Sequence, residues 1–339
     1  MNDTERFLII APSWIGDSII FQSLLISIKD KHKGSTIDVI AKPELIELLK
    51  LMPQINQIYP LDIDHGILGL AKRINLAKIL SSKNYTQSVI LPNSFKSAII
   101  PWLSKIPIRI GYNKELRFLL INKSYKFIKY EDKMVDRYLK LIGEKYSEKL
   151  RPQLNIEQDT KEVYKKKYLL NNSKKNIFLC PEAEYGTAKR WPNNNWVELA
   201  SAYESHNYNI YFLGKDMKLN DKYKEVLQKK SVVSLIGKTN IKDASYLLAL
   251  ADLIISNDSG LMHLSALADT PTVGLFGPSD SKRYHPWGKK TLAIKSPKSP
   301  NQLMGHKEFN PKKVNSLMKD LTVNYVFKEL IKFYKTCYD

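Results

Sequence analysis

The alternation of short apolar runs with helical segments is the feature that most restricts how this chain can fold. Segments with apolar residues at helical spacing separate a first series of runs that are typical of buried strands, at residues 6–11, 36–41, 55–61 and 88–91. A second series follows residue 175, with runs at 176–180, 209–213, 232–235, 253–255 and 272–275. Strands separated by helices of this length pair in parallel. We therefore expect an α/β fold with two Rossmann-like α/β/α domains.

A polar stretch at residues 147–175 separates the two series. The 339 residues are many for one domain of ordinary size, and a hydrophobic content of 43% is enough for two cores. We predict an N-terminal domain over residues 1–165 and a C-terminal domain over residues 166–322. A last helix, over residues 323–339, is expected to pack back toward the N-terminal domain.

Small and polar residues follow several of the expected strands. Asp258, Ser259 and Gly260 stand between the run at 253–255 and a segment with helical spacing, which indicates a strand, a tight turn and a helix start. In a parallel sheet such a turn lies at the carboxyl end of a strand, where backbone N–H groups at the helix start attract anions. The alternative is an ordinary capped helix without a ligand.

A similar turn follows the first strand. Gly16 allows close approach of the backbone, and Asp17 stands in the first turn of the next helix, where a carboxylate is stabilised as an N-cap. The chain contains neither the glycine pattern of dinucleotide-binding proteins at this turn nor a P-loop. Asp62 and Asp64 match the D-x-D pattern of metal-dependent transferases, but this pattern is weak and a turn cap explains it as well. We predict no metal site.

The net charge of +19 indicates a negatively charged partner, such as nucleic acid, an anionic membrane surface or a phosphorylated substrate. Scattered lysines that only solvate the surface are the alternative. Between residues 105 and 129 a basic stretch is balanced only by Glu115, and we interpret it as a patch that faces anions or as a solvated loop. Its members are Arg109, Lys114, Arg117, Lys123, Lys126 and Lys129.

The two cysteines, Cys180 and Cys337, lack the spacing of zinc ligands or of a disulfide framework. No apolar run approaches the ~18 residues of a membrane helix, and the run near the N-terminus is too short for a signal peptide. We therefore expect a cytoplasmic protein that touches the membrane from inside.

Four segments together resemble the ADP-heptose:lipopolysaccharide heptosyltransferases of glycosyltransferase family 9. They are APSWIGD at 11–17, LPNSFKSA at 91–98, AEYGTAKRWP at 183–192 and NDSGLMH at 257–263. The resemblance extends over about residues 6 to 280 in the same order, which makes it far more specific than any single motif. One departure is Glu182, where the family usually has glycine. This departure places a carboxylate near the expected donor phosphates.

The resemblance implies a GT-B fold, in which two Rossmann-like domains face each other across a deep cleft. It implies that the N-terminal domain holds a lipid-linked acceptor and that the C-terminal domain holds ADP-L-glycero-β-D-manno-heptose. The implied reaction is inverting and independent of metal, with the donor substrate in place of any cofactor. Asp17 is similar in position to the general base, and Lys189 with the backbone N–H groups of residues 259–261 would stabilise the departing ADP.

The resemblance also implies two sets of binding residues. The donor set is Tyr185, Gly186, Thr187, Asp258, Ser259, Gly260, Leu261 and His263. The acceptor set is Ser13, Asn93, Lys96 and Arg109. For His263, packing inside its helix is an equally good interpretation, and Trp191 is better explained as a core residue than as a platform for the base.

The preferred function is transfer of heptose to the first heptose of the lipopolysaccharide inner core. The expected partners are ADP-heptose, a phosphorylated lipid A–Kdo–heptose acceptor and the anionic inner face of the inner membrane, where the protein would be peripheral. A first-heptose transferase, or another GT-B enzyme that uses a nucleotide sugar, is the alternative. A basic protein that binds nucleic acid is a third possibility, but no recognised nucleic-acid module occurs in the sequence.

Overall fold

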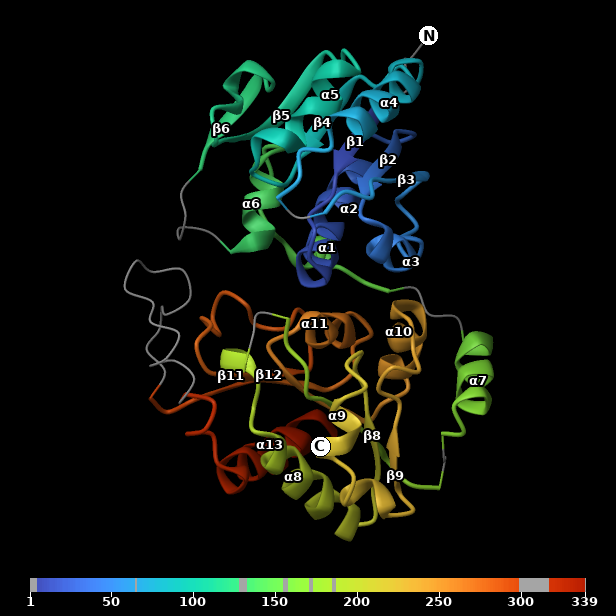
Figure 1. Ribbon diagram of the computed structural model, residues 1–339, viewed down its shortest axis with the longest axis vertical. Helices are drawn as coiled ribbons and strands as arrows, with labels where there is room; N and C mark the ends of the chain where they lie inside the picture. The colour runs from blue at the N-terminus through green and yellow to red at the C-terminus, as the bar shows by residue number, and fades with distance from the viewer. Residues whose placement is uncertain are drawn as a thin grey trace. The chain divides into compact units, whose positions relative to one another are not determined.

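The computed structural model describes residues 5–64, 66–127, 133–154, 158–170, 173–184, 187–298 and 317–338. The chain divides into two compact units, Met1–Gln153 (unit 1) and Leu154–Asp339 (unit 2). Each unit contains one six-stranded sheet in which all pairs are parallel (Figure 1). No helix among the described residues combines the length and the apolar character needed to cross a membrane.

Unit 1 is built from the first alternating series. Its strands are β1 (Arg6–Ile10), β2 (Thr36–Ala41), β3 (Gln57–Pro60), β4 (Gln87–Ile90), β5 (Ile108–Asn113) and β6 (Lys123–Lys126). Its helices are α1 (Ile15–Ile20), α2 (Gln22–Lys31), α3 (Ile46–Leu49), α4 (Leu70–Ser81), α5 (Ile99–Leu103) and α6 (Met134–Lys140).

The strand order of unit 1 is β3-β2-β1-β4-β5-β6. β1 pairs with β2 on one side and with β4 on the other, so that Leu8 stands opposite Asp38 and Ser88. Strands β1 to β3 therefore extend the sheet to one side and strands β4 to β6 extend it to the other. The direction of this order reverses between β1 and β4. In open α/β sheets, ligands bind at the carboxyl ends of the strands beside such a switch point.

One face of this sheet forms a core with α4 and α5. Leu8, Ile40 and Ile90 from three neighbouring strands pack with Leu80 of α4 and Ile100 of α5, and all five side chains are buried. β1 is apolar at almost every position because helices cover a parallel sheet on both faces.

Unit 2 repeats the design with the second series. Its strands are β7 (Asn176–Cys180), β8 (Asn209–Phe212), β9 (Val232–Ser234), β10 (Leu253–Asn257), β11 (Thr272–Phe276) and β12 (Thr291–Lys295). Its helices are α7 (Gln158–Lys167), α8 (Asn193–Ser205), α9 (Leu219–Lys222), α10 (Ile241–Ala249), α11 (Gly260–Leu267) and α13 (Val323–Tyr338). The boundary predicted between residues 165 and 166 falls inside α7.

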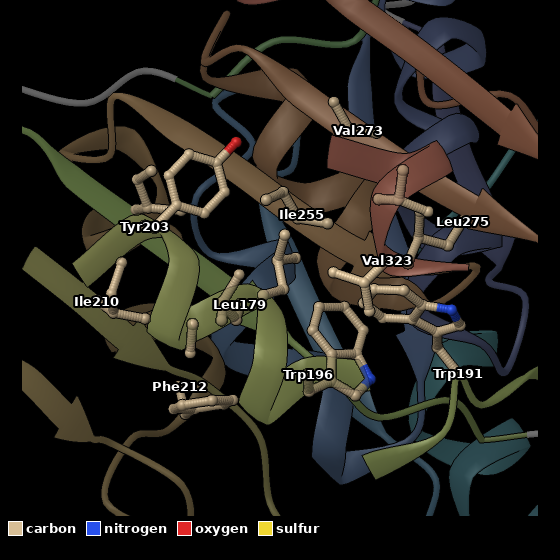
Figure 2. Close-up of a cluster of buried hydrophobic side chains, with 14 of the residues drawn as sticks. Leu179, Trp191, Trp196, Tyr203, Ile210, Phe212, Ile255, Val273, Leu275 and Val323 are labelled. Carbon is tan, nitrogen blue, oxygen red and sulfur yellow. The ribbon is translucent and has the colours of Figure 1, made fainter. Parts of the chain in front are cut away.

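The strand order of unit 2 is β12-β11-β10-β7-β8-β9, with the switch point between β7 and β10. A large apolar cluster covers one face of this sheet. Figure 2 shows Trp191 and Trp196 beside Leu179 and Leu275 in this cluster, and the two indole rings pack edge to face at 5.1 Å between centroids.

The C-terminal helix α13 belongs to this same core. Val323, Val326 and Leu330 are at most 7% exposed and pack in the cluster that contains the two tryptophans, and Figure 2 shows Val323 among them. These contacts lie within unit 2, and the expectation that this helix packs toward the N-terminal domain stays a prediction. The apolar face of α13 is therefore apolar because it packs in the core of unit 2.

Candidate functional site

The carboxyl ends of β7 and β10 meet at the switch point of unit 2. Asn257, the last residue of β10, is fully buried and connects the two strand ends. Its Nδ2 donates to the Pro181 carbonyl at 2.6 Å, and its Oδ1 accepts from the Trp191 backbone N–H at 3.1 Å. Both ends of the loop that follows β7 are therefore fixed to β10. This loop carries the predicted catalytic lysine.

Lys189 and Asp258 lie together at this point. Lys189 Nζ is 2.5 Å from Asp258 Oδ2, and the two side chains are only 15% and 6% exposed. Ser279 Oγ, from the segment after β11, donates to the same carboxylate oxygen at 2.5 Å. A cation held this close to a parallel-sheet switch point, with little water around it, is suited to binding a phosphate.

The amino terminus of α11 lies directly after Asp258, at the same switch point. Ser259 is the N-cap residue in an extended conformation and makes no side-chain capping hydrogen bond. The N–H groups of the first turn of α11, which include those of Gly260 and Leu261, attract negative charge because they have no carbonyl partner within the helix. Ser259, Gly260 and Leu261 are all partly exposed. A diphosphate can therefore approach the helix start.

His263 lies one turn further along α11 and is only 5% exposed. Its Nδ1 has no hydrogen-bond partner among the described residues. Burial lowers the pKa of His263 to about 4, against the opposing effect of the Asp258 carboxylate and with a further lowering by Lys189. The imidazole is therefore neutral at pH 7. It is close enough to the Lys189–Asp258 pair to share its electrostatic environment.

Glu182 does not extend toward Lys189 but is turned toward the end of β8. Its Oε1 accepts from the backbone N–H groups of Lys215 and Asp216 at 2.7 and 2.6 Å. A side chain on Gly214 would place its Cβ 2.4 Å from the same oxygen, so the Glu182 carboxylate would have to move away from these two donors. The carboxylate that departs from the family pattern therefore organises the loop after β8.

Other residues of the loop after β7 have separate roles. Thr187 is exposed, and its carbonyl accepts from the Arg190 backbone N–H at 3.0 Å. Trp191 is 1% exposed and donates from Nε1 to the Leu321 carbonyl at 2.7 Å, so its interpretation as a core residue is confirmed. Tyr185 and Gly186 lie outside the described residues.

In unit 1, Asp17 stands beside the carboxyl end of β1. The N-cap of α1 is Trp14, and Asp17 is the acidic residue of the first helical turn, so the interpretation of Asp17 as the N-cap itself is wrong. Its side chain is partly exposed. Burial, and then the negative charge of Asp17, raise the pKa of Tyr138 in α6. The Asp17 carboxylate therefore lies close to α6.

A pocket of about 110 Å³ opens at the carboxyl ends of β1, β2, β3 and β4. Ser13 and Lys96, two predicted acceptor residues, both line it. Lys42, Arg73 and Asp64 complete its charged lining, so three basic groups face one acidic group. Arg73 is 6% exposed, donates from Nε to the Leu68 carbonyl at 2.7 Å, and has its pKa lowered by burial. The pocket is suited to an anionic ligand.

The other two predicted acceptor residues, Asn93 and Arg109, do not line this pocket. Asn93 Oδ1 accepts from Arg117 Nη2 at 3.4 Å. Arg109 lies near the start of β5, and its guanidinium donates to the carbonyls of Leu120 and Ile106 at 2.7 and 2.6 Å. The Arg109 guanidinium therefore stabilises the loop between β5 and β6 through these hydrogen bonds.

Arg117 corrects the interpretation of the basic stretch as one exposed patch. It is fully buried, and burial lowers its pKa to about 10. It fits because Gly111, beside it, has no side chain, and a Cβ there would lie 3.2 Å from Nη2. Lys129 lies outside the described residues.

The D-x-D residues face different surroundings. Asp62 is largely exposed and lies 3.8 Å from Lys72 Nζ, whereas Asp64 lines the pocket of unit 1. Among the described residues no group of three or more His, Cys, Asp or Glu side chains is arranged to hold a metal ion.

Several residues of these sites were not predicted from sequence. Asn257 and Ser279 in unit 2 and Lys42 and Arg73 in unit 1 reach their sites from different strands or helices, which no local pattern reveals. Only Asn257 carried a signal, because a polar amide ends an apolar strand directly before the predicted turn.

The sequence model of glycosyltransferase family 9 (heptosyltransferase) matches residues 73–313. Lipopolysaccharide heptosyltransferase 2 of Salmonella typhimurium is 34% identical to this chain over 305 residues, which cover 86% of this chain and 88% of that protein. The protein of the same name from Escherichia coli is 33% identical over 309 residues, with the same coverage.

The solved structure of the Escherichia coli ADP-heptose LPS heptosyltransferase II matches with a TM-score of 0.84 and 30% identity, covering 98% of this chain and 100% of that one. This match confirms the predicted α/β fold class of the GT-B type. Together with the family match over most of the chain, it confirms the resemblance seen in the four motifs. The chain belongs to glycosyltransferase family 9, the heptosyltransferase family.

Proposed function

We propose that this protein transfers heptose from ADP-heptose to the first heptose of the lipopolysaccharide inner core. The observation that carries the proposal is the Lys189–Asp258 pair at the switch point of unit 2, in a chain that belongs to a heptosyltransferase family. The identity of 34% to a lipopolysaccharide heptosyltransferase 2 supports the second heptose as the product, in preference to the first.

Unit 2 binds the donor. Lys189 and the first-turn N–H groups of α11 hold the diphosphate, because both present positive charge at the same strand ends. Asp258 then exchanges its contact with Lys189 for hydroxyl groups of the sugar, while Ser279 keeps the carboxylate in place. His263, neutral at pH 7, offers a ring nitrogen to the same ligand.

Unit 1 binds the acceptor. The pocket lined by Lys42, Arg73 and Lys96 receives an anionic group of the inner core, a sugar carboxylate or a phosphate. Ser13 supplies a hydroxyl group at the rim of the same pocket. Asp17, four positions after Ser13 and in the first turn of α1, is partly exposed, and its carboxylate serves as the base.

The reaction is a single displacement with inversion. The acceptor hydroxyl attacks the anomeric carbon of the heptose, and Asp17 takes its proton as the new C–O bond forms. The bond from the anomeric carbon to the phosphate oxygen breaks, and ADP leaves with the electron pair. Lys189 and the α11 amino terminus stabilise the negative charge that develops on the phosphate, a role for which no metal is needed.

The lipid-linked acceptor also determines where in the cell the protein acts. The protein acts in the cytoplasm, peripherally on the inner face of the inner membrane. The net charge of +19 supports this placement, because the membrane surface and the acceptor are both anionic.

The test is a transfer assay with purified protein, ADP-heptose and two acceptors, one without heptose and one with a single heptose. The proposal predicts ADP release and a product of increased mass only with the second acceptor. Turnover restricted to the acceptor without heptose would assign the protein to the first step instead.

A binding measurement separates the wider alternatives. ADP-heptose, and not a UDP-sugar, is expected to raise the melting temperature, because a ligand that binds only the folded state stabilises it. Protection by UDP-sugars alone would indicate another nucleotide-sugar enzyme. Salt-sensitive binding of RNA, without any effect of nucleotide sugars, would contradict the proposal entirely.

A further inference from the structure

The loop between β5 and β6 presents three large apolar side chains to the surface of unit 1. Leu116, Phe118 and Leu119 are 76%, 54% and 71% exposed. We call these three residues the apolar tip. Single exposed apolar residues are common, but three within four positions on one loop form a local apolar surface that points to a binding role.

The apolar tip is held from inside by a buried arginine. Arg117 is fully buried, although it lies between Leu116 and Phe118 in the sequence. Its guanidinium donates to the carbonyls of Tyr112 and Pro92 at 2.7 and 2.5 Å, and to Ser97 Oγ at 3.1 Å. Because the arginine side chain occupies the interior, its apolar neighbours face outward.

The backbone of the loop is also in an unusual conformation. Glu115 and Leu116 have φ angles of 52° and 55°, in the left-handed region that disfavours side chains with a Cβ. Glu115 is held there by its carboxylate, which accepts from the Phe95 backbone N–H at 3.0 Å. Strained backbone persists where the surrounding structure enforces it and is concentrated at functional positions. The outward direction of Leu116 is therefore enforced.

Exposed lysines flank the apolar tip in the sequence. Lys114, Lys123 and Lys126 are exposed, and the pairing of Asn113 with Lys126 places Lys126 beside the start of the loop. Glu115 is the only acidic residue between positions 105 and 127, and its carboxylate faces the backbone of Phe95. Exposed apolar side chains flanked by exposed lysines match the chemistry of an anionic lipid surface.

We propose that the apolar tip inserts into the headgroup region of an anionic bilayer while Lys114, Lys123 and Lys126 bind lipid phosphates. This surface deepens the proposed function, on which the expectation of a lipid-linked acceptor rests. Three side chains on one loop are too few for a stable protein interface, which buries about 1,000 Å² or more. They are enough for a reversible anchor that adds to electrostatic attraction.

The test is flotation of the full chain with vesicles of phosphatidylglycerol and phosphatidylethanolamine, compared with vesicles of phosphatidylcholine. The variant combines Leu116→Asn, Phe118→Ser and Leu119→Ser, in which asparagine suits the left-handed backbone. Leu169→Asn in unit 2 is the matched control, because Leu169 is 85% exposed and also has a positive φ, of 52°.

We expect wild type and Leu169→Asn to bind the anionic vesicles equally and the triple variant to bind about 10-fold or more weakly, since burial of each apolar side chain contributes to partitioning. Its melting temperature and its turnover of a delipidated acceptor should stay at the wild-type level. Equal vesicle binding by the triple variant would overturn the proposal and leave the apolar tip to a protein partner. If wild type binds vesicles through the tip but transfers no heptose, the proposed function fails and this inference stands.

Discussion

Lys189 Nζ lies 2.5 Å from Asp258 Oδ2, although 69 positions separate the two residues in the sequence. The lysine comes from the loop after β7 and the aspartate from the end of β10, the two strands on either side of the switch point of unit 2. A diphosphate that binds here has to share the lysine with the carboxylate. In the proposed mechanism, the pair therefore couples donor binding to the position of Asp258.

Replacing Lys189 by alanine should impair donor use. A charge-assisted hydrogen bond to a phosphate contributes roughly 1.5 to 3 kcal/mol, so kcat/KM for ADP-heptose should fall by about 10- to 150-fold. Stability should also fall, because Asp258 loses its buried cation. Steady-state kinetics with ADP-heptose provide the measurement.

The matched control is Lys242→Ala, which removes an exposed lysine from α10 of the same unit. Its kinetics should equal those of wild type. Equal kinetics for Lys189→Ala would contradict the phosphate role and leave Lys189 as a structural partner of Asp258.

The pocket of unit 1 predicts a separate effect on the acceptor. Lys42→Ala combined with Lys96→Ala should raise the KM for the acceptor several-fold, more at low salt than at high salt, since both lysines are partly exposed and salt screens such charges. The affinity for ADP should not change. Lys78→Ala on the exposed side of α4 is the control. A parallel loss of acceptor and donor binding would show misfolding instead.

The buried histidine of α11 predicts how stability depends on pH. The pKa of His263 is about 4 in the folded protein, below the usual value of 6.5. As pH falls from 6.5 toward 4, the unfolded chain takes up a proton that the folded protein excludes, so stability is lost in this window. A shift of this size corresponds to about 3 kcal/mol.

His263→Gln should therefore flatten the decrease in the free energy of unfolding between pH 6.5 and 4. His206→Gln, which replaces an exposed histidine of unit 2, should leave the decrease as it is in wild type. Denaturant titrations at several pH values measure both. An unchanged slope for His263→Gln would show that the imidazole is hydrated or paired in solution.

Two substitutions of Glu182 separate its structural role, as an acceptor for the loop after β8, from an electrostatic effect on the donor phosphates. Glu182→Gln keeps the oxygen that accepts from Lys215 and Asp216, so stability and ADP affinity should stay close to wild type. Glu182→Ala leaves two backbone donors unpaired and should cost about 1 to 3 kcal/mol of stability. A clear gain in ADP affinity for Glu182→Gln would instead show that the carboxylate repels the donor phosphates.

Much of the fold could be predicted because the strands of a parallel sheet are continuous apolar runs. β1, β2 and β7 stand out in the sequence for this reason. β6 does not, because an edge strand with the sequence KSYK is mostly exposed and carries no apolar pattern. Within the described part of the chain it pairs only with β5, and from the sequence its lysines are equally typical of a loop or a surface patch.

The candidate site could be predicted only where a motif is local. Asp258, Ser259 and His263 follow one strand directly, so the sequence alone predicts that they lie close to one another. The partnership of Arg117 with the loop after β4 was not, because it depends on how two loops meet in three dimensions. A basic residue in a basic stretch was expected at the surface, yet its guanidinium satisfies carbonyls in the interior.

Asp17 tests the catalytic proposal most sharply, because its structural and chemical roles predict different results. The N-cap of α1 is Trp14, so the charge of Asp17 contributes at most about 1 kcal/mol through the helix dipole. Asp17→Asn keeps the shape of the side chain and should leave the melting temperature and ADP affinity nearly unchanged. A carboxylate that acts as general base cannot be replaced by an amide.

The most direct measurement is therefore kcat of Asp17→Asn with ADP-heptose and the acceptor that carries one heptose, beside ADP affinity and melting temperature. The proposal predicts that turnover falls by about 10²- to 10⁴-fold while ADP affinity and melting temperature stay at the wild-type level. Turnover close to that of wild type would contradict the assignment of Asp17 as the base and, with it, the proposed mechanism.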